Sequence, residues 1–132
     1  MEASDYLFVY GTLQKNLDND MSKFLSENAQ IVGKGYFHGK LYRVSWFPGA
    51  ITSINTSDKV YGSIFKLINS ETVFNVLDDY EGVGDNHTKP NLYRKEIVTA
   101  YLENRDALKT WVYIYNHSIS HLKQIISGDF LK

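Results

Sequence analysis

The sequence predicts an α+β fold, one domain over residues 1–132, in which the sheet curls into a small barrel. Segments with the alternating or continuous apolar pattern of strands outnumber the helical segments, which are short. Aromatic residues make up 14% of the chain and include 10 tyrosines, which suits a well-filled barrel or a tyrosine-lined cavity. The sequence contains no repeat, linker or low-complexity segment that would divide it.

The first predicted strand, Tyr6–Tyr10, consists of aromatic, β-branched and aliphatic residues, so we expect it to be buried on both faces. Gly11 ends this strand, because glycine permits a sharp turn and a close approach to the backbone. The N–H groups of the turn and the Thr12 hydroxyl would suit an anion such as a carboxylate. A plain structural turn is the alternative.

One short helix and four strands are predicted between this turn and residue 68. Asn19 caps the helix, and Met21, Phe24 and Leu25 form its apolar stripe. The four strands cover residues 31–37, 40–44, 50–54 and 60–68. His38-Gly39 is expected to form a tight turn between the first two of them, and residues 46–49 interrupt the sheet pattern.

The second half of the chain predicts a helix, two long strands and a final short helix. Asn69 or Ser70 caps the helix at 71–80, whose buried face is Val73, Phe74, Leu77 and Tyr80. Gly82 suits its C-terminal cap, and residues 83–91 form a long loop. The strands cover 93–102 and 108–116, and the final helix covers 120–126 with Leu122, Ile125 and Ile126 as its apolar positions.

Charge and composition argue against several classes of partner. The net charge is -1 and the two signs are interspersed, so no basic stripe is available for nucleic acid. The first residues lack the features of a signal peptide, and no apolar run approaches membrane-spanning length. We therefore expect a cytoplasmic protein with no membrane partner. The sequence leaves the oligomeric state, monomer or weak dimer, open. Cysteine is absent, which excludes disulfides, thiolate metal sites and a cysteine nucleophile.

Glu81 is the acidic residue with the most unusual position. It follows Asp78 and Asp79 at the end of the predicted helix, where the helix dipole disfavours negative charge. If those two aspartates point outward, Glu81 falls about one turn from Leu77, on or beside the buried stripe. A carboxylate there either has a function or marks a frayed helix end.

Other candidate groups are less informative. His117 and His121 have the spacing of a metal pair only if they are helical, and with no third ligand nearby a solvated or capping role is favoured. No serine lies in a Gly-x-Ser-x-Gly setting. Trp111, Tyr113 and Tyr115 alternate along the last long strand, so their shared face is either core or the wall of a cavity.

Two of these segments together resemble the signatures of the γ-glutamyl cyclotransferase-like family. Val9–Leu13 is similar to its Tyr-Gly-Ser/Thr-Leu motif, and Leu77–Gly82 is similar to the aromatic-Glu pair that closes a short helix. Further matches are Phe47–Ile51, Leu92–Arg94, Val112-Tyr113 and Ile126–Phe130, the last with Phe in place of the family's Trp. The resemblance runs from about residue 6 to residue 130.

The resemblance implies a small mixed β-barrel flanked by short helices, with a cavity beside the first motif. It implies that the turn Tyr10, Gly11, Thr12 and Leu13 binds the α-carboxylate of a γ-glutamyl substrate and that Glu81 is the acid/base. The products would be 5-oxoproline and a free amine, formed without a cofactor or metal. By the same resemblance, the remaining substrate-binding residues are Pro48, Gly49, Tyr93 and Tyr113.

This chemistry agrees with the residues present. The substrate's own α-amine attacks its γ-carbonyl, so orientation of a tethered nucleophile supplies much of the rate. One carboxylate can take the proton from the α-ammonium and return it to the leaving amine. Two alternatives stay open: a non-catalytic protein that binds a small carboxylate or amine in the same pocket, and a scaffold with a filled barrel and no site.

Overall fold

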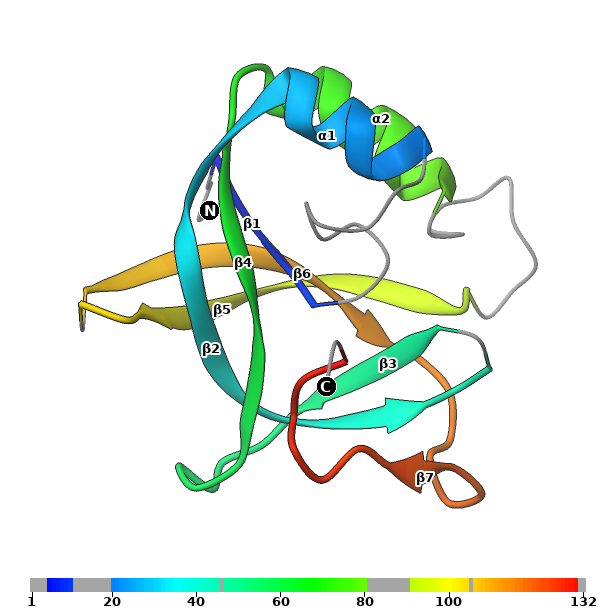
Figure 1. The fold of residues 1–132 in the computed structure, drawn as a ribbon. Coiled ribbons are helices and arrows are strands. Elements are labelled where there is room, and N and C mark those ends of the chain that lie inside the picture. Colours follow the sequence, from blue (N-terminus) through cyan, green and yellow to red (C-terminus); the bar gives the residue numbers. More distant parts are fainter. Residues whose placement is uncertain (1–4, 11–19, 46, 81–90, 105, 131–132) are drawn as a thin grey trace.

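The computed structural model describes residues 5–10, 20–45, 47–80, 91–104 and 106–130. The described residues form two helices and seven strands (Figure 1). In chain order these are β1 (Tyr6–Val9), α1 (Asp20–Asn28), β2 (Ala29–Arg43), β3 (Pro48–Thr52), β4 (Lys59–Leu67), α2 (Ser70–Tyr80), β5 (Tyr93–Leu102), β6 (Ala107–Tyr115) and β7 (Lys123–Gln124).

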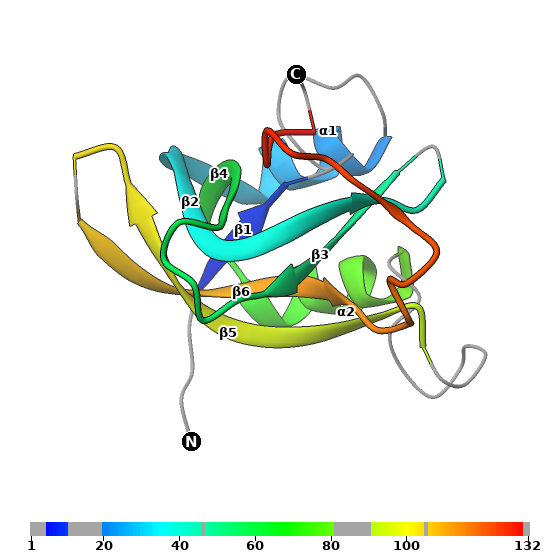
Figure 2. The same cartoon turned by 90° about the horizontal axis from the view of Figure 1, so that it is seen from below.

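Five strands close into the barrel that the sequence predicts. Their order is β2-β4-β1-β6-β5, and β5 pairs back with β2 through Tyr36↔Tyr101 and Gly35↔Leu102. The sheet is mixed, because β1 runs parallel to β6 while the other pairs are antiparallel. Figures 1 and 2 show the closed shape, with both helices against one end of the barrel and β3 lying beside the last part of β2.

Strand β1 separates two apolar layers, as its composition predicts. Phe8 and Tyr10 point into the barrel interior with Phe37, Ile64 and Val112. The alternate positions of β1, Leu7 and Val9, instead face an outer layer under the helices. That outer layer includes Leu25 of α1, Val73, Phe74 and Leu77 of α2, and Tyr113 and Tyr115 of β6. Burial of β1 on both faces is therefore confirmed, and the aromatic face of β6 lies beneath α2 rather than inside the barrel.

The predicted turn at His38-Gly39 is wrong, because β2 runs unbroken from Ala29 to Arg43. His38 still pairs with Lys59 of β4, whereas Gly39 already pairs with Thr52 of β3. A Cβ at position 39 would lie 2.3 Å from the main-chain oxygen of Ile51. This glycine therefore allows a neighbouring strand to come close, and it does not reverse the chain.

Strand β3 begins two residues earlier than predicted, at Pro48. The interruption of the sheet lies just before it, where the N–H groups of Val44 and Ser45 both donate to the Phe47 carbonyl, at 3.1 and 3.2 Å. Arg43 and Pro48 are then the first partners of the β2–β3 pair. A proline is tolerated there because it is the first residue of the strand.

Helix α2 has the predicted cap and most of the predicted buried face. The Thr72 N–H donates to Asn69 Oδ1 at 3.3 Å, which identifies Asn69 as the capping residue. Val73, Phe74 and Leu77 are buried as expected, whereas Tyr80 is exposed. The predicted cap at Gly82 and most of the loop at 83–91 lie outside the described residues.

The predicted C-terminal helix at 120–126 is wrong. Lys123 and Gln124 form β7, which pairs with Arg43 and Tyr42 of β2, and the Ile125 N–H donates to the Leu41 carbonyl at 2.7 Å. The open edge of β2 offers main-chain partners that the apolar spacing of this segment does not reveal. Ile126, expected on the buried face, is 82% exposed.

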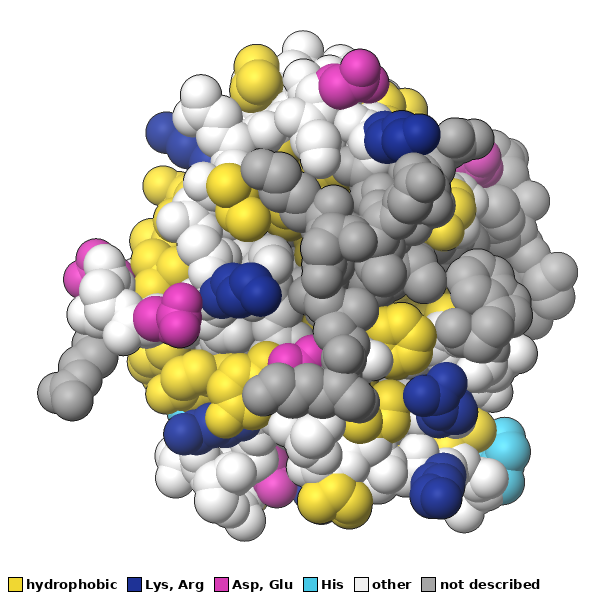
Figure 3. All heavy atoms as spheres, viewed as in Figure 1, with side chains coloured by type: hydrophobic (Ala, Val, Ile, Leu, Met, Phe, Trp, Pro, Cys, Tyr) yellow, Lys and Arg dark blue, Asp and Glu magenta, His cyan; other side chains and the backbone are white. Residues whose placement is uncertain are grey.

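The described surface mixes charges of both signs. On the face shown in Figure 3, the acidic and basic side chains are interspersed rather than gathered by sign. No helix among the described residues is long and apolar enough to cross a membrane.

Candidate active site

The predicted site residues fall into two groups. Tyr10, Pro48, Gly49, Tyr93 and Tyr113 belong to the described part of the chain. Gly11, Thr12, Leu13 and Glu81, which carry the predicted carboxylate-binding and acid/base roles, lie outside the described residues. The described part of the site therefore consists of residues that flank these four in sequence or contact those that do.

Tyr10, directly after β1, connects three strands through its hydroxyl group. The hydroxyl donates to the main-chain oxygen of Tyr113 in β6 at 2.5 Å and accepts the N–H of Ala50 in β3 at 3.2 Å. The tyrosine ring is buried in the barrel interior next to Ala50. This buried hydroxyl is satisfied as both donor and acceptor, so it fixes the end of β1 against its neighbours.

Tyr93, Pro48 and Gly49 meet beside this point. The Tyr93 hydroxyl donates to the Pro48 carbonyl at 2.6 Å and joins the start of β5 to the start of β3. A Cβ at Gly49 would lie 2.8 Å from Cγ of Tyr115, so the ring of Tyr115 packs directly on the backbone of β3. The structure thus brings together the five described residues that the sequence assigns to the site.

Asp78 is a residue of this region to which the sequence assigned no role, since only the case in which it points outward was considered. Its Oδ1 accepts the hydroxyl of Tyr113 at 2.7 Å, and its Oδ2 accepts Nζ of Lys95 at 3.1 Å. A signal for this contact was present: Asp78 stands in the last turn of a helix that has no basic residue there. An acid in that position needs a cation from elsewhere in the chain.

Tyr113 therefore contacts both segments that resemble the family signatures. Its main-chain oxygen binds Tyr10, and its hydroxyl binds Asp78. Gly11 follows Tyr10 directly, and Glu81 comes 3 residues after Asp78 in the sequence. The last described residues of two motifs that are far apart in the chain are thus joined through one residue, Tyr113.

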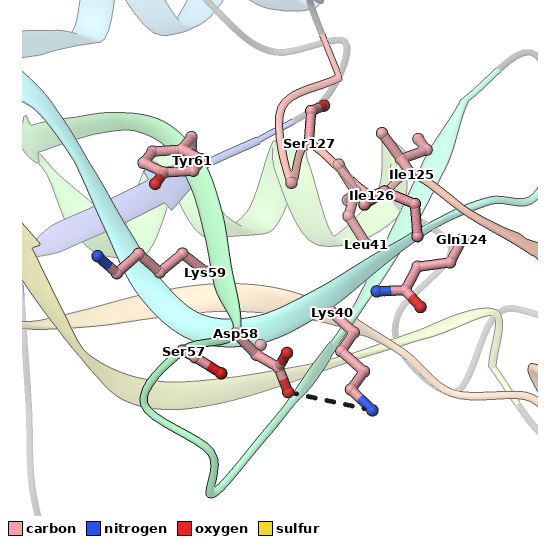
Figure 4. Close-up of a pocket in the computed structure, with 12 residues that line it drawn as sticks. Lys40, Leu41, Ser57, Asp58, Lys59, Tyr61, Gln124, Ile125, Ile126 and Ser127 are labelled. Atoms are coloured by element: carbon pink, nitrogen blue, oxygen red, sulfur yellow. Dashed lines mark ion pairs between the residues drawn. The ribbon is translucent and has the colours of Figure 1, made fainter.

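A pocket of about 180 Å³ lies elsewhere on the molecule (Figure 4). It is bordered by Gly39–Leu41 of β2, by Ser57–Lys59 before and at the start of β4, and by Gln124–Gly128. Lys40 and Asp58 form an ion pair at its edge, with Nζ and Oδ2 4.0 Å apart. None of the five described site residues lines this pocket, and Asp58 comes after Thr52, at the end of β3 opposite to Pro48.

The two histidines of the C-terminal region do not lie on a helix. His117 packs against the ring of Tyr115, with 5.8 Å between ring centroids, and His121 lies in a turn before β7. Within the described ranges, no three His, Asp or Glu side chains are grouped so that they could hold a metal ion.

Comparisons with known proteins identify the family. Residues 7–132 match the family model described as gamma-glutamyl cyclotransferase, AIG2-like. Protein MJ1514 of Methanocaldococcus jannaschii is 28% identical over 128 residues, which cover 96% of this chain and 95% of the relative. The gamma-glutamylcyclotransferase family protein YtfP of Escherichia coli K12 is 26% identical over 126 residues, covering 95% of each chain.

Solved structures share the fold. The crystal structure of an AIG2-like protein from Mus musculus has a TM-score of 0.68 with 21% identity, covering 93% of this chain and 86% of the mouse chain. The closed barrel with helices at one end is thus the fold of these relatives. The match of the family model over residues 7–132 shows that the chain belongs to the AIG2-like gamma-glutamyl cyclotransferase family.

Proposed function

We propose that this protein is a γ-glutamyl cyclotransferase that releases 5-oxoproline and a free amine or amino acid from a γ-glutamyl compound. Family membership supports the class of reaction. The observation that carries the proposal is the pair of contacts of Tyr113, to Tyr10 at 2.5 Å and to Asp78 at 2.7 Å. These contacts hold together the starting points of the two segments that the reaction needs.

The first segment supplies the binding site for the α-carboxylate. In the proposal, the N–H groups of Gly11, Thr12 and Leu13 and the Thr12 hydroxyl hold this carboxylate, since successive main-chain N–H groups suit an anion. The buried hydroxyl contacts of Tyr10 support this role, because they fix the residue from which the turn departs. Pro48, Gly49, Tyr93 and Tyr113 form the surrounding wall.

The second segment supplies the acid/base, Glu81. The carboxylate takes one proton from the α-ammonium, and the freed nitrogen attacks the γ-carbonyl carbon of the same molecule. A C–N bond forms to close the lactam, the C–N bond to the leaving amine breaks, and Glu81 returns the proton to that amine. The attacking nitrogen loses a second proton as it becomes the lactam N–H, and Glu81 passes this proton to the amine as well, which leaves as an ammonium ion. Atoms and charge balance without a further reactant, so the proposal includes no cofactor or metal.

Detection of 5-oxoproline by mass spectrometry tests the proposal. The protein is incubated with γ-glutamyl-alanine, γ-glutamyl-ε-lysine and glutathione in parallel, so that the same experiment identifies the leaving group. We expect Glu81→Gln to lower the rate by about 10²–10⁴-fold, the usual contribution of a general acid/base. The variant keeps the size of the side chain, and thermal denaturation shows whether it is folded.

Two outcomes would contradict the proposal. Folded wild-type protein that forms no product from any of the three compounds is not a cyclotransferase for these substrates. If such protein binds a γ-glutamyl compound and Glu81→Gln binds it nearly as well, the pocket belongs to a binding protein instead.

A further inference from the structure

Asp78 joins the last turn of α2 to two neighbouring strands. Its Oδ1 accepts the Tyr113 hydroxyl at 2.7 Å and its Oδ2 accepts Lys95 Nζ at 3.1 Å. Lys95 in β5 and Tyr113 in β6 are cross-strand partners, so the two donors lie side by side on the sheet. The side chains of Asp78 and Lys95 are 29% and 20% exposed, so water screens their charges only in part.

Lys95 supplies a positive charge that α2 lacks. The last turn of α2 contains Asp78 and Asp79 and no basic residue, although the carbonyl groups at a helix C-terminus favour a cation. Lys95 Nζ lies 4.0 Å from the centroid of the Phe74 ring and 5.2 Å from that of Trp111. These two rings hold the ammonium group against the helix. The end of α2 is thereby fixed relative to the sheet.

The same contacts connect the end of α2 with the end of β1. Ala50 N–H donates to the Tyr10 hydroxyl, the Tyr10 hydroxyl donates to the Tyr113 carbonyl, and the Tyr113 hydroxyl donates to Asp78. The first two bonds are buried and the third is partly buried. Among the residues joined by these hydrogen bonds, Asp78 is the one that belongs to α2, the helix that precedes Glu81.

We propose that Asp78 is a positioning residue for the cyclotransferase reaction: held by Lys95 and Tyr113, it sets the point from which the chain runs to Glu81. The inference rests on the proposed function, in which Glu81 must meet an amine whose carboxylate is bound next to Tyr10. A misplacement of about 1 Å in such a site costs about 10²-fold in rate. Asp78 touches no substrate in this arrangement, so its effect passes through Glu81.

The substitution Asp78→Asn tests the proposal most directly. Asparagine keeps the size of the side chain and an oxygen that can accept the Tyr113 hydroxyl, but it removes the charge that faces Lys95. We expect kcat to fall by about 10–10²-fold, while KM changes little because the carboxylate-binding turn is untouched. Lys95→Met should act in the same direction, and Lys95→Arg, which keeps the charge, should retain most of kcat.

Asp58→Asn is the matched control. Asp58 also accepts a hydroxyl, that of Ser53 at 2.8 Å, and also faces a lysine, Lys40 at 4.0 Å. It borders the separate pocket of Figure 4 and contacts none of the predicted site residues in the described contacts. We expect this variant to keep the wild-type kcat. Thermal denaturation of every variant separates a loss of folded protein from a loss of rate.

Combination with Glu81→Gln provides a readout that a merely structural role would not change. If Asp78 acts through Glu81, the double variant should be no slower than Glu81→Gln alone. A wild-type kcat in Asp78→Asn would overturn this inference, and so would a double variant in which the two losses multiply. In either case, a low rate of Glu81→Gln would still support the proposed function. Wild-type protein without 5-oxoproline formation would overturn the proposed function and this inference with it.

Discussion

At the scale of single residues, buried hydroxyl groups explain why tyrosines stand at the site. Tyr10 and Tyr93 place their rings in apolar surroundings and direct their hydroxyl groups to main-chain partners on other strands. A phenylalanine would fill the same space but would leave those partners unsatisfied. The abundance of tyrosine in the sequence thus reflects connections between strands as well as apolar filling.

The substitution Tyr10→Phe tests this explanation. It removes a hydroxyl that serves both the Tyr113 carbonyl and the Ala50 N–H, so we expect the free energy of unfolding to fall by about 1–3 kcal/mol. Urea denaturation measures the change. Tyr61→Phe is the control, because the Tyr61 side chain is 39% exposed and water can take the place of its hydroxyl group. We expect its free energy of unfolding to change by no more than about 0.5 kcal/mol. Equal effects of the two substitutions would contradict the explanation.

Asp78 shows the limit of site prediction from single residues. Helical spacing could only say that Asp78 and Asp79 were adjacent acids near a helix end. The choice between them depends on where Lys95 and Tyr113 lie, on strands that follow the helix in sequence. The partners of a side chain at a helix end come from outside the helix, so its spacing alone cannot reveal them.

At the scale of elements, glycines in β3 and β4 allow close packing of strands. Gly62 pairs with Gly35 of β2, and a Cβ on Gly62 would lie 2.2 Å from the main-chain oxygen of Val9 in β1. At Gly49 a Cβ would meet only side chains, the nearest being Tyr115 at 2.8 Å. These side-chain atoms can shift by a small amount, whereas the main-chain oxygen of β1 is held by the barrel.

Alanine substitutions at these two glycines should therefore differ in cost. We expect Gly49→Ala to lower the free energy of unfolding by about 1–3 kcal/mol, the usual cost of overpacking, and Gly62→Ala to lower it more. Denaturant unfolding of the two variants against wild type measures both effects. The opposite order would mean that the Tyr115 ring is held more rigidly than the strand that carries Val9.

A comparison of α2 with the C-terminal segment shows which elements can be predicted from local sequence and which cannot. Helix α2 has its cap at Asn69 and its buried residues Val73, Phe74 and Leu77, all of them recognisable within one segment. The C-terminal segment has apolar residues at helical spacing as well, but it pairs with Arg43 and Tyr42 instead. Its structure depends on the edge of the last part of β2, which is far away in the sequence, so periodicity predicted it incorrectly.

At the scale of the whole molecule, stability depends on the filled interior of the barrel. Phe8, Phe37, Ile64 and Val112 come from four different strands and are almost completely buried. The outer layer adds the helices over the aromatic face of β6. The site residues lie where these two layers meet, since Tyr10 belongs to the interior and Tyr93 and Tyr113 to the outer layer.

Two isoleucines of the same region test the importance of the interior. Ile64 in β4 is fully buried, whereas Ile68, just after that strand, is 70% exposed. We expect Ile64→Ala to lower the free energy of unfolding by about 2–5 kcal/mol through lost burial and a cavity. For Ile68→Ala we expect a change within about 0.5 kcal/mol. Chemical denaturation, followed by tryptophan fluorescence, measures the free energy of unfolding of both variants. Similar losses in the two would contradict a filled, rigid interior.

Four features were predictable from the sequence: the fold class, the doubly buried β1, the helix α2 with its cap, and the likeness of two short motifs to one family. These features depend on residues close together in the chain, where propensity, capping and apolar spacing act directly. Three features became visible only in the folded chain: β2 passes unbroken through Gly39, β7 replaces a helix, and Tyr113 joins Tyr10 to Asp78. Each of these results from pairing between segments distant in sequence, because the partner that satisfies a backbone or side-chain group becomes available only when the barrel closes.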